Sequence, residues 1–225
     1  MNAKMPISAG ARRLRDFKAE FAASASPGHK TAELDRFSRE LIRKGADVAF
    51  LKGIVLEHQE YHRIYFQVSL AGFDDAAAQF AFIEENFDLL QDWWHVDQLT
   101  QFLRKVEFGF ALRKAEAYVL DPRPYVRRWG YVLFIPYLLK EAGAAEMLFP
   151  LFRDDDEYTV QMAEAWLISC LAMQKPEKTF AFLRDTSLRY SITGKAIQKI
   201  CDSFRVTEEW KSRFRGLRAS CRGIR

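Results

Sequence analysis

Apolar residues recur at spacings of three and four along almost the whole chain, which is the period of an amphipathic α-helix. The segments FAFIEENFDLLQDWW and AIQKICDSF show this pattern clearly. No run of alternating apolar and polar residues predicts a β-strand. The sequence therefore predicts an all-α fold, with the helix that contains Trp93 continuing past Asp97.

Short breaks rich in Gly, Pro or Asp interrupt this pattern and predict the ends of helices. They divide the chain into about a dozen predicted helices of roughly 10 to 18 residues with short connections. A compact bundle would usually have fewer and longer helices. We therefore expect an α-solenoid of stacked antiparallel helix pairs, HEAT-like or armadillo-type, as one domain over residues 1–225. The breaks lie at residues 24–31, 72–75, 121–124, 141–144, 153–156 and 174–177.

Positive charge is concentrated near the C-terminus. Residues 184–225 contain 11 Lys and Arg against 4 Asp and Glu, although the net charge of the whole chain is only +4. Such an asymmetry is typical of a segment that binds a polyanion, and nucleic acid is the commonest one. A solubilising basic tail, from about residue 216, explains the composition equally well.

The cysteine count and the apolar segments indicate the cellular compartment. Three cysteines without a CxxC spacing argue against a disulfide framework and against a thiolate metal site. The first residues have no apolar core of a secretory signal, and no stretch has the roughly 20 apolar residues of a membrane span. We expect a cytoplasmic protein that does not contact membranes.

Two adjacent tryptophans precede an acid in the stretch QDWWHVDQLT. On a helix Trp93 and Asp97 share one face, and Trp94 lies nearly as close to the acid. An aromatic face beside a carboxylate could stabilise a developing cation in a site that excludes bulk water. A core tryptophan beside a solvated aspartate explains the spacing as well.

Two arginines follow the turn DPRP in the segment YVRRWGYVLF. Arg127 and Arg128 lie in the predicted first turn of a helix, where the helix dipole favours anions rather than cations. That placement becomes favourable if both the guanidinium groups and the helix end meet a phosphate. An arginine that reaches solvent or Asp121 is the alternative.

Two further features are weaker as signals of function. Trp166 lies in a helix of otherwise small residues, VQMAEAWLISCLA, and such a tryptophan more often belongs to the core. His58 and His62 have the helical spacing of metal ligands, but the sequence offers no third ligand beside them. We predict no metal site and no organic cofactor.

Taken together and in order, the segments WWHVD, YVRRWGYV and VQMAEAWL resemble the helical-repeat DNA alkylation repair proteins, the AlkC/AlkD superfamily of bacterial alkylpurine DNA glycosylases. The resemblance covers roughly residues 45–205. It implies a HEAT-like fold and an enzyme that hydrolyses the N-glycosidic bond of cationic N3- or N7-alkylated purines in duplex DNA. The implied partner is double-stranded DNA carrying alkylated bases, and we expect a monomer.

The resemblance also implies a role for each site residue. Trp93 and Trp166 would form aromatic walls against the damaged nucleoside, and Asp97 would lie at the deoxyribose. Arg128 would bind a nearby backbone phosphate, with Arg127 as a second DNA contact. Indole faces attract cations, so the two tryptophans would favour an alkylated, cationic base over a normal one.

Two other hypotheses remain open from the sequence. One is a catalytically inactive HEAT-like paralogue that acts as a nucleic-acid- or protein-binding module. The other is a purely structural α-solenoid. The enzyme hypothesis requires Trp93, Asp97, Arg128 and Trp166 to converge on one solvent-open surface, and it weakens if either tryptophan is buried.

Overall fold

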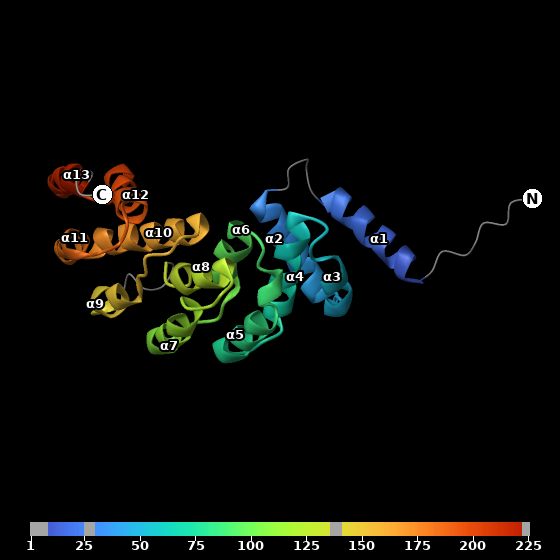
Figure 1. The fold of residues 1–225 in the computed structure, drawn as a ribbon. Helices are drawn as coiled ribbons and strands as arrows, with labels where there is room; N and C mark the ends of the chain where they lie inside the picture. Colours follow the sequence, from blue (N-terminus) through green and yellow to red (C-terminus); the bar gives the residue numbers. More distant parts are fainter. Residues whose placement is uncertain (1–8, 25–29, 136–140, 222–225) are drawn as a thin grey trace, which may run out of the picture. The chain divides into compact units, whose positions relative to one another are not determined.

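The computed structural model describes residues 9–24, 30–135 and 141–221 (Figure 1). All regular structure within these ranges is helical, with 13 α-helices, three short 3₁₀ helices and no strand. The predicted all-α fold is confirmed. None of the described helices combines the length and the apolar composition that crossing a membrane would require.

The chain divides into two compact units, residues 1–74 and residues 75–225, so a single domain over the whole chain stays a prediction. In the first unit α2 and α3 both pack on α4, and α1 contacts α2. Phenylalanine and tyrosine rings from these helices meet edge to face in its core. The helices of this unit are α1 (Ala9–Ser24), α2 (Thr31–Arg43), α3 (Val48–Ile54) and α4 (Gln59–Ala71).

In the second unit the main packing contacts join helices that are one or two places apart in the order of the chain (Figure 1). Helix α8 contacts α6, α7 and α10, while α10 contacts α11 and α12, and α12 contacts α13. This pairwise packing is consistent with the predicted stack of helix pairs. Its α-helices are α5 (Ala76–Glu85), α6 (Trp93–Asp97), α7 (Phe108–Tyr118), α8 (Pro124–Val132), α9 (Ala144–Leu148), α10 (Tyr158–Gln174), α11 (Pro176–Asp185), α12 (Tyr190–Asp202) and α13 (Glu208–Cys221).

Helix α10 forms the centre of the second unit. Most of its side chains are buried, because helices α8, α11 and α12 all pack against it. Helix α8 begins at Pro124, whose missing N–H is tolerated in the first turn of a helix. Close packing of α8 depends on Gly130: a Cβ at this position would lie 2.8 Å from Val119 Cγ1 and 3.2 Å from the Val119 backbone nitrogen.

All six predicted breaks fall at helix ends, but the helices are less uniform than predicted, with lengths from 5 to 17 residues. The expectation that the helix of Trp93 continues past Asp97 is wrong, because α6 ends at Asp97 and a 3₁₀ helix, Leu99–Phe102, follows. Before α6 the chain leaves α5 at Asn86, whose side chain donates a hydrogen bond to the carbonyl of Phe82. A hydrogen bond from a polar side chain to the backbone therefore marks the end of α5, although the apolar residues keep their helical spacing beyond it.

The basic tail predicted from about residue 216 begins inside a helix. Residues 208–221 form α13, and residues 222–225 lie outside the described part of the chain.

Candidate active site

Asp97 and Arg128 form the centre of the candidate site. Arg128 Nε lies 2.9 Å from Asp97 Oδ1, and Nη2 lies 2.8 Å from Oδ2, so the guanidinium binds both carboxylate oxygens. Arg128 Nη1 also donates to the backbone carbonyl of Thr159, at 2.6 Å. One buried side chain on α8 therefore joins the C-terminal end of α6 to the first turn of α10.

The two members of this pair differ in their access to solvent. The Arg128 side chain is 6% exposed, whereas the Asp97 side chain is 18% exposed. A carboxylate has about four lone-pair positions, and Arg128 uses two of them. Asp97 can therefore still accept a hydrogen bond from a water molecule or a ligand, while Arg128 faces the protein.

Trp93 is the first residue of α6 and lies one helical turn before Asp97. Its side chain is 56% exposed, which is unusual for a residue of this size. Asp92 caps the helix, because its Oδ1 accepts the Trp93 N–H at 2.6 Å. Trp94, in contrast, is partly buried, with its ring 4.2 Å from the ring of His95. Trp93, and not Trp94, presents an open indole face.

His95 is a residue of this site that the sequence analysis missed. It is buried in α6, and its Nδ1 accepts the backbone N–H of Gln91 at 3.1 Å. Burial lowers the pKa of His95 to about 4, against the opposing effects of Asp92 and of a backbone hydrogen bond to Leu89. A neutral His95 thus ties α6 to the loop before it and helps to fix the position of Trp93. The sequence signal for the burial of His95 was its position between the apolar residues Trp94 and Val96.

Trp166 lies in the middle of α10 and is partly exposed. It follows Thr159 by seven residues, which is two helical turns on the same face and about 10 Å along the axis. Trp166 therefore lies on the side of α10 whose first turn accepts the Arg128 hydrogen bond. Trp166 also lines a pocket of about 450 Å³ between α10 and the end of α12.

The structure thus brings Asp97 and Arg128 into direct contact and places the two tryptophans on the helices that this pair connects. Neither Trp93 nor Trp166 is buried, whereas Arg128, which the enzyme hypothesis also expects on the open surface, is buried. The convergence of all four residues on one surface stays a prediction.

Arg127, the second predicted DNA contact, also has protein partners. Its Nε and Nη2 bind the two carboxylate oxygens of Asp155, at 2.6 and 3.2 Å, and its Nη1 donates to the carbonyls of Asp121 and Pro122. The neighbouring Asp155 raises the pKa of Arg127. Both adjacent arginines of α8 are therefore held by aspartates, and phosphate binding by Arg127 and Arg128 stays a prediction.

Glu164 is a second buried group that the sequence analysis missed. It lies on α10, and its Oε1 accepts the backbone N–H of Arg153 at 2.9 Å. Burial raises the pKa of Glu164 to about 8, although hydrogen bonds from Arg153 and Tyr131 oppose the shift. Its place in the core of the second unit gives it a structural role.

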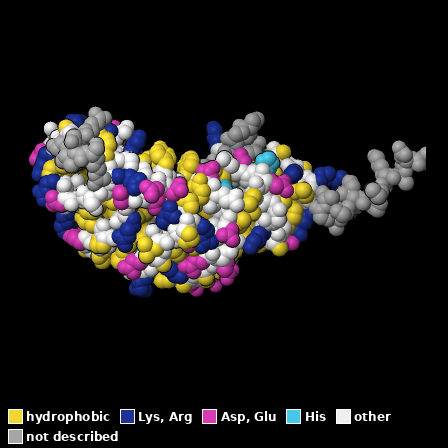
Figure 2. Space-filling model, viewed as in Figure 1, with side chains coloured by type: hydrophobic (Ala, Val, Ile, Leu, Met, Phe, Trp, Pro, Cys, Tyr) yellow, Lys and Arg dark blue, Asp and Glu magenta, His cyan; other side chains and the backbone are white. Residues whose placement is uncertain are grey.

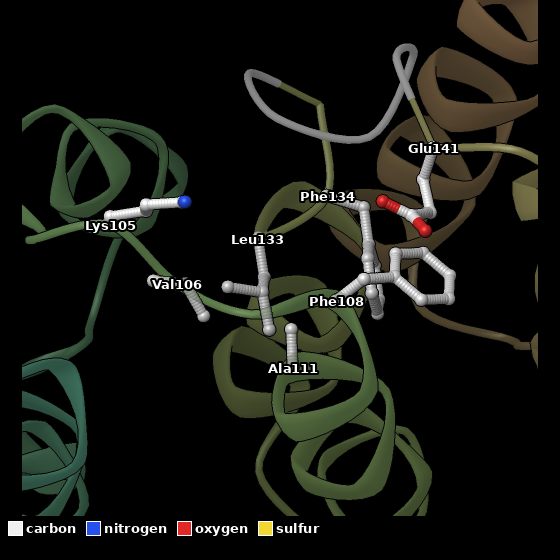
Figure 3. A pocket seen from close by; sticks show the side chains of 7 residues that line it. All are labelled: Lys105, Val106, Phe108, Ala111, Leu133, Phe134 and Glu141. Carbon is white, nitrogen blue, oxygen red and sulfur yellow. The ribbon is translucent and has the colours of Figure 1, made fainter.

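A second, smaller pocket of about 190 Å³ lies beside α7 and the end of α8 (Figure 3). The rings of Phe108 and Phe134 lie 6.1 Å apart at this pocket, and the carboxylate of Glu141 points toward them. Leu133 and Ala111 complete the apolar lining. No residue that was predicted from the sequence to bind DNA contributes to it.

Comparison with known proteins identifies the family. A family model described as DNA alkylation repair enzyme matches residues 25–200, which is most of the chain and includes all three sequence motifs. Searches of curated proteins and of solved structures gave no match. The family predicted from the motifs is confirmed: the chain belongs to the DNA alkylation repair enzyme family.

Proposed function

We propose that this chain is a DNA glycosylase that hydrolyses the N-glycosidic bond of cationic N3- or N7-alkylated purines in duplex DNA. One observation carries the proposal: a carboxylate fixed by a buried arginine lies one turn from an open indole face, in a chain of the DNA alkylation repair family.

The chemistry of the reaction suits Asp97. When the bond from deoxyribose to the base breaks, positive charge develops on the sugar, and a nearby carboxylate stabilises it. The same carboxylate can accept a proton from the attacking water. An alkylated purine already carries a positive charge, so it leaves as a neutral base and needs no strong general acid.

Arg128 serves in this proposal as a positioning residue. Its planar guanidinium holds Asp97 by two hydrogen bonds, and the bond to the Thr159 carbonyl fixes the guanidinium in turn. A group held in place before the reaction needs little reorganisation as charge develops. With only 6% of its side chain exposed, Arg128 is better placed to orient Asp97 than to bind a phosphate.

The exposed indoles provide selectivity for the damaged base. A cation over an indole face is stabilised by roughly 0.5 to 2 kcal/mol, depending on how far it is desolvated. A neutral, undamaged purine lacks this charge term. Trp93, beside Asp97, would contact the nucleoside that reacts, and Trp166 would contact the same nucleoside or its neighbour.

Release of free base tests the proposal. The purified chain is incubated with methylated duplex DNA, and 7-methylguanine and 3-methyladenine are separated chromatographically. We expect time-dependent release that leaves abasic sites in the DNA, and no release of normal bases. Binding to the same DNA without release would indicate the inactive paralogue instead.

A further inference from the structure

The pocket beside Trp166 is an open surface groove between α10 and the end of α12. Trp166 and Met173 line it from α10, and Lys199 and Asp202 line it from α12. Phe204 and Arg205, in the turn before α13, complete this set, which we call the α10–α12 groove. Its volume of about 450 Å³ lies in the range of ligand-binding sites, roughly 300 to 1,000 Å³.

The basic residues of the α10–α12 groove are not neutralised by the protein. Lys199 and Arg205 are exposed, and neither has an ion-pair partner among the residues that the structure describes. Arg127 and Arg128, by comparison, are each held by an aspartate. Asp202 also lines the groove, so its local charge is +1. Figure 2 shows further Lys and Arg side chains along the end of the molecule that carries α11 to α13.

Phe204 has an aromatic ring that the fold leaves in solvent. It is 89% exposed, the largest value among the exposed apolar side chains of the described residues. Leaving such a ring in water forgoes the free energy of burial, about 2 kcal/mol for a phenylalanine. The Arg205 guanidinium lies 5.5 Å from the ring centroid, so a cation and an aromatic face are presented side by side.

The turn that carries Phe204 and Arg205 is held by hydrogen bonds. Ser203 Oγ accepts the backbone N–H of Arg205 at 3.2 Å and donates to the sulfur of Met173 at 3.5 Å. The backbone N–H of Ser203 donates to the carbonyl of Ile200 at 3.2 Å. The exposed ring is therefore attached to a fixed turn beside α10, and a ligand would meet it largely pre-positioned.

We propose that the α10–α12 groove binds the DNA strand next to the damaged nucleotide. Phe204 inserts at a base step of the duplex, as the apolar side chains of DNA-bending proteins do, and stacks on the exposed base. Lys199 and Arg205 contact the phosphates on either side of that base. The inference rests on the proposed function, since it takes the nucleotide at Asp97 as the damaged one. It assigns the phosphate contacts to two cations that form no ion pair with the residues that the structure describes.

Binding to undamaged duplex DNA tests the groove separately from catalysis. Fluorescence anisotropy at several salt concentrations compares the wild-type chain with the Lys199→Ala/Arg205→Ala double variant and with Phe204→Ala. Arg113→Ala is the matched control, because Arg113 is an exposed cation on α7 outside the groove. Circular dichroism verifies that every variant is folded.

We expect the double variant to bind at least about 10-fold more weakly, with the slope of log K against log salt reduced by about 2, one for each phosphate contact. Phe204→Ala should lose about fivefold or more with an unchanged slope. Unchanged affinity in both variants, or an equal loss of affinity in Arg113→Ala, would contradict the proposal that the groove binds DNA.

The two proposals fail in different ways. Base release by the wild type, together with unaltered binding in the groove variants, would refute the groove and leave the glycosylase intact. Weakened binding in the groove variants without any base release would refute the glycosylase and leave a DNA-binding groove. Absence of wild-type binding to undamaged duplex DNA would overturn the groove, and absence of base release from methylated DNA would overturn the glycosylase.

Discussion

The carboxylate of Asp97 and the guanidinium of Arg128 are joined by two hydrogen bonds, of 2.9 and 2.8 Å, across the contact between α6 and α8. Under the proposed function, this relationship gives Arg128 the role of orienting the Asp97 carboxylate. It also removes from the surface a cation that the sequence had suggested for DNA.

Replacing Arg128 with lysine separates an orienting role from a phosphate contact. Lysine keeps the charge but cannot bind both carboxylate oxygens in one plane. We expect single-turnover base release to slow roughly 10- to 100-fold, because Asp97 is no longer fixed, while the affinity for duplex DNA changes by less than twofold. The matched control is Arg63→Lys, since Arg63 forms two hydrogen bonds with Asp35 in the first unit. A large loss of affinity with an unchanged rate would instead assign Arg128 to a phosphate.

The two adjacent tryptophans should respond differently to truncation. Trp93→Ala removes a mostly exposed indole, so the free energy of unfolding should change by less than about 0.5 kcal/mol, while release of the cationic base falls. Trp94→Ala removes a partly buried ring and should cost about 1 to 3 kcal/mol. Denaturant unfolding and base-release assays on both variants test the assignment. A strongly destabilised Trp93→Ala variant would place that indole in the core.

Stability should fall in mildly acidic solution because of His95. Its pKa in the folded chain is about 4, below the ordinary value of 6.5. The unfolded chain therefore takes up a proton that the folded chain excludes, and the free energy of unfolding decreases as the pH falls from 6.5 to 4. Urea unfolding across this range should show a shallower decline for His95→Asn, whose amide oxygen can still accept the Gln91 N–H. An identical slope in both proteins would rule out His95 as the source.

Glu164 should lower the free energy of unfolding as the pH rises, which is the opposite pH dependence to that of His95. Burial raises its pKa to about 8 from an ordinary value of 4.5, so the folded chain keeps a proton that the unfolded chain loses. Its contribution to stability is full below pH 4.5 and is lost as the pH rises through 8. Glu164→Gln, which is neutral at every pH, should flatten the decline between pH 4.5 and pH 8. Retention of the wild-type slope in that variant would contradict the assignment.

Gly130 should be required for the packing of α8 on the end of α7. A Cβ at this position would lie 2.8 Å from Val119 Cγ1, in a fully packed region. We expect Gly130→Ala to lower the free energy of unfolding by about 1 to 3 kcal/mol through overpacking. The control is Gly216→Ala in α13, where a Cβ would meet nothing within 4 Å. Equal stability of the two variants would show that α7 and α8 can move apart.

Helical periodicity and turn residues predicted the all-α fold and all six breaks, because both signals are local in sequence. The length of α6 was missed, although Asn86 and Asp92 are residue types that end and begin helices. The helical spacing of apolar residues continues through both positions, so this pattern alone did not reveal the helix ends. Burial was equally hard to predict for the tryptophans: Trp129 is fully buried in α8, which contains two arginines, whereas Trp166 is partly exposed in the more apolar α10.

The partners of charged residues could not be predicted from the chain. Arg128 meets Asp97 from 31 positions away, and the placement of either helix against the other decides this contact. The same holds for Arg127 and Asp155. The sequence analysis named Asp121 as an alternative partner for the two arginines, and Arg127 does donate to the Asp121 carbonyl. It named no charged partner for Asp97, and the roles of the site residues stay predictions. Lys199 and Arg205, which form no ion pair within the described part of the chain, appeared in the sequence only as part of a basic segment.

The most direct measurement is the single-turnover release of 7-methylguanine by Asp97→Asn, with Asp35→Asn as the matched control. Asp35 also receives two hydrogen bonds from a buried arginine and has a similar exposure, 26% against 18% for Asp97. With DNA saturated by each protein, we expect Asp97→Asn to be slower than the wild type by about 100-fold or more, and Asp35→Asn to remain within twofold of it. Equal rates for the Asp97 variant and the wild type would contradict the assignment of Asp97 as the catalytic carboxylate.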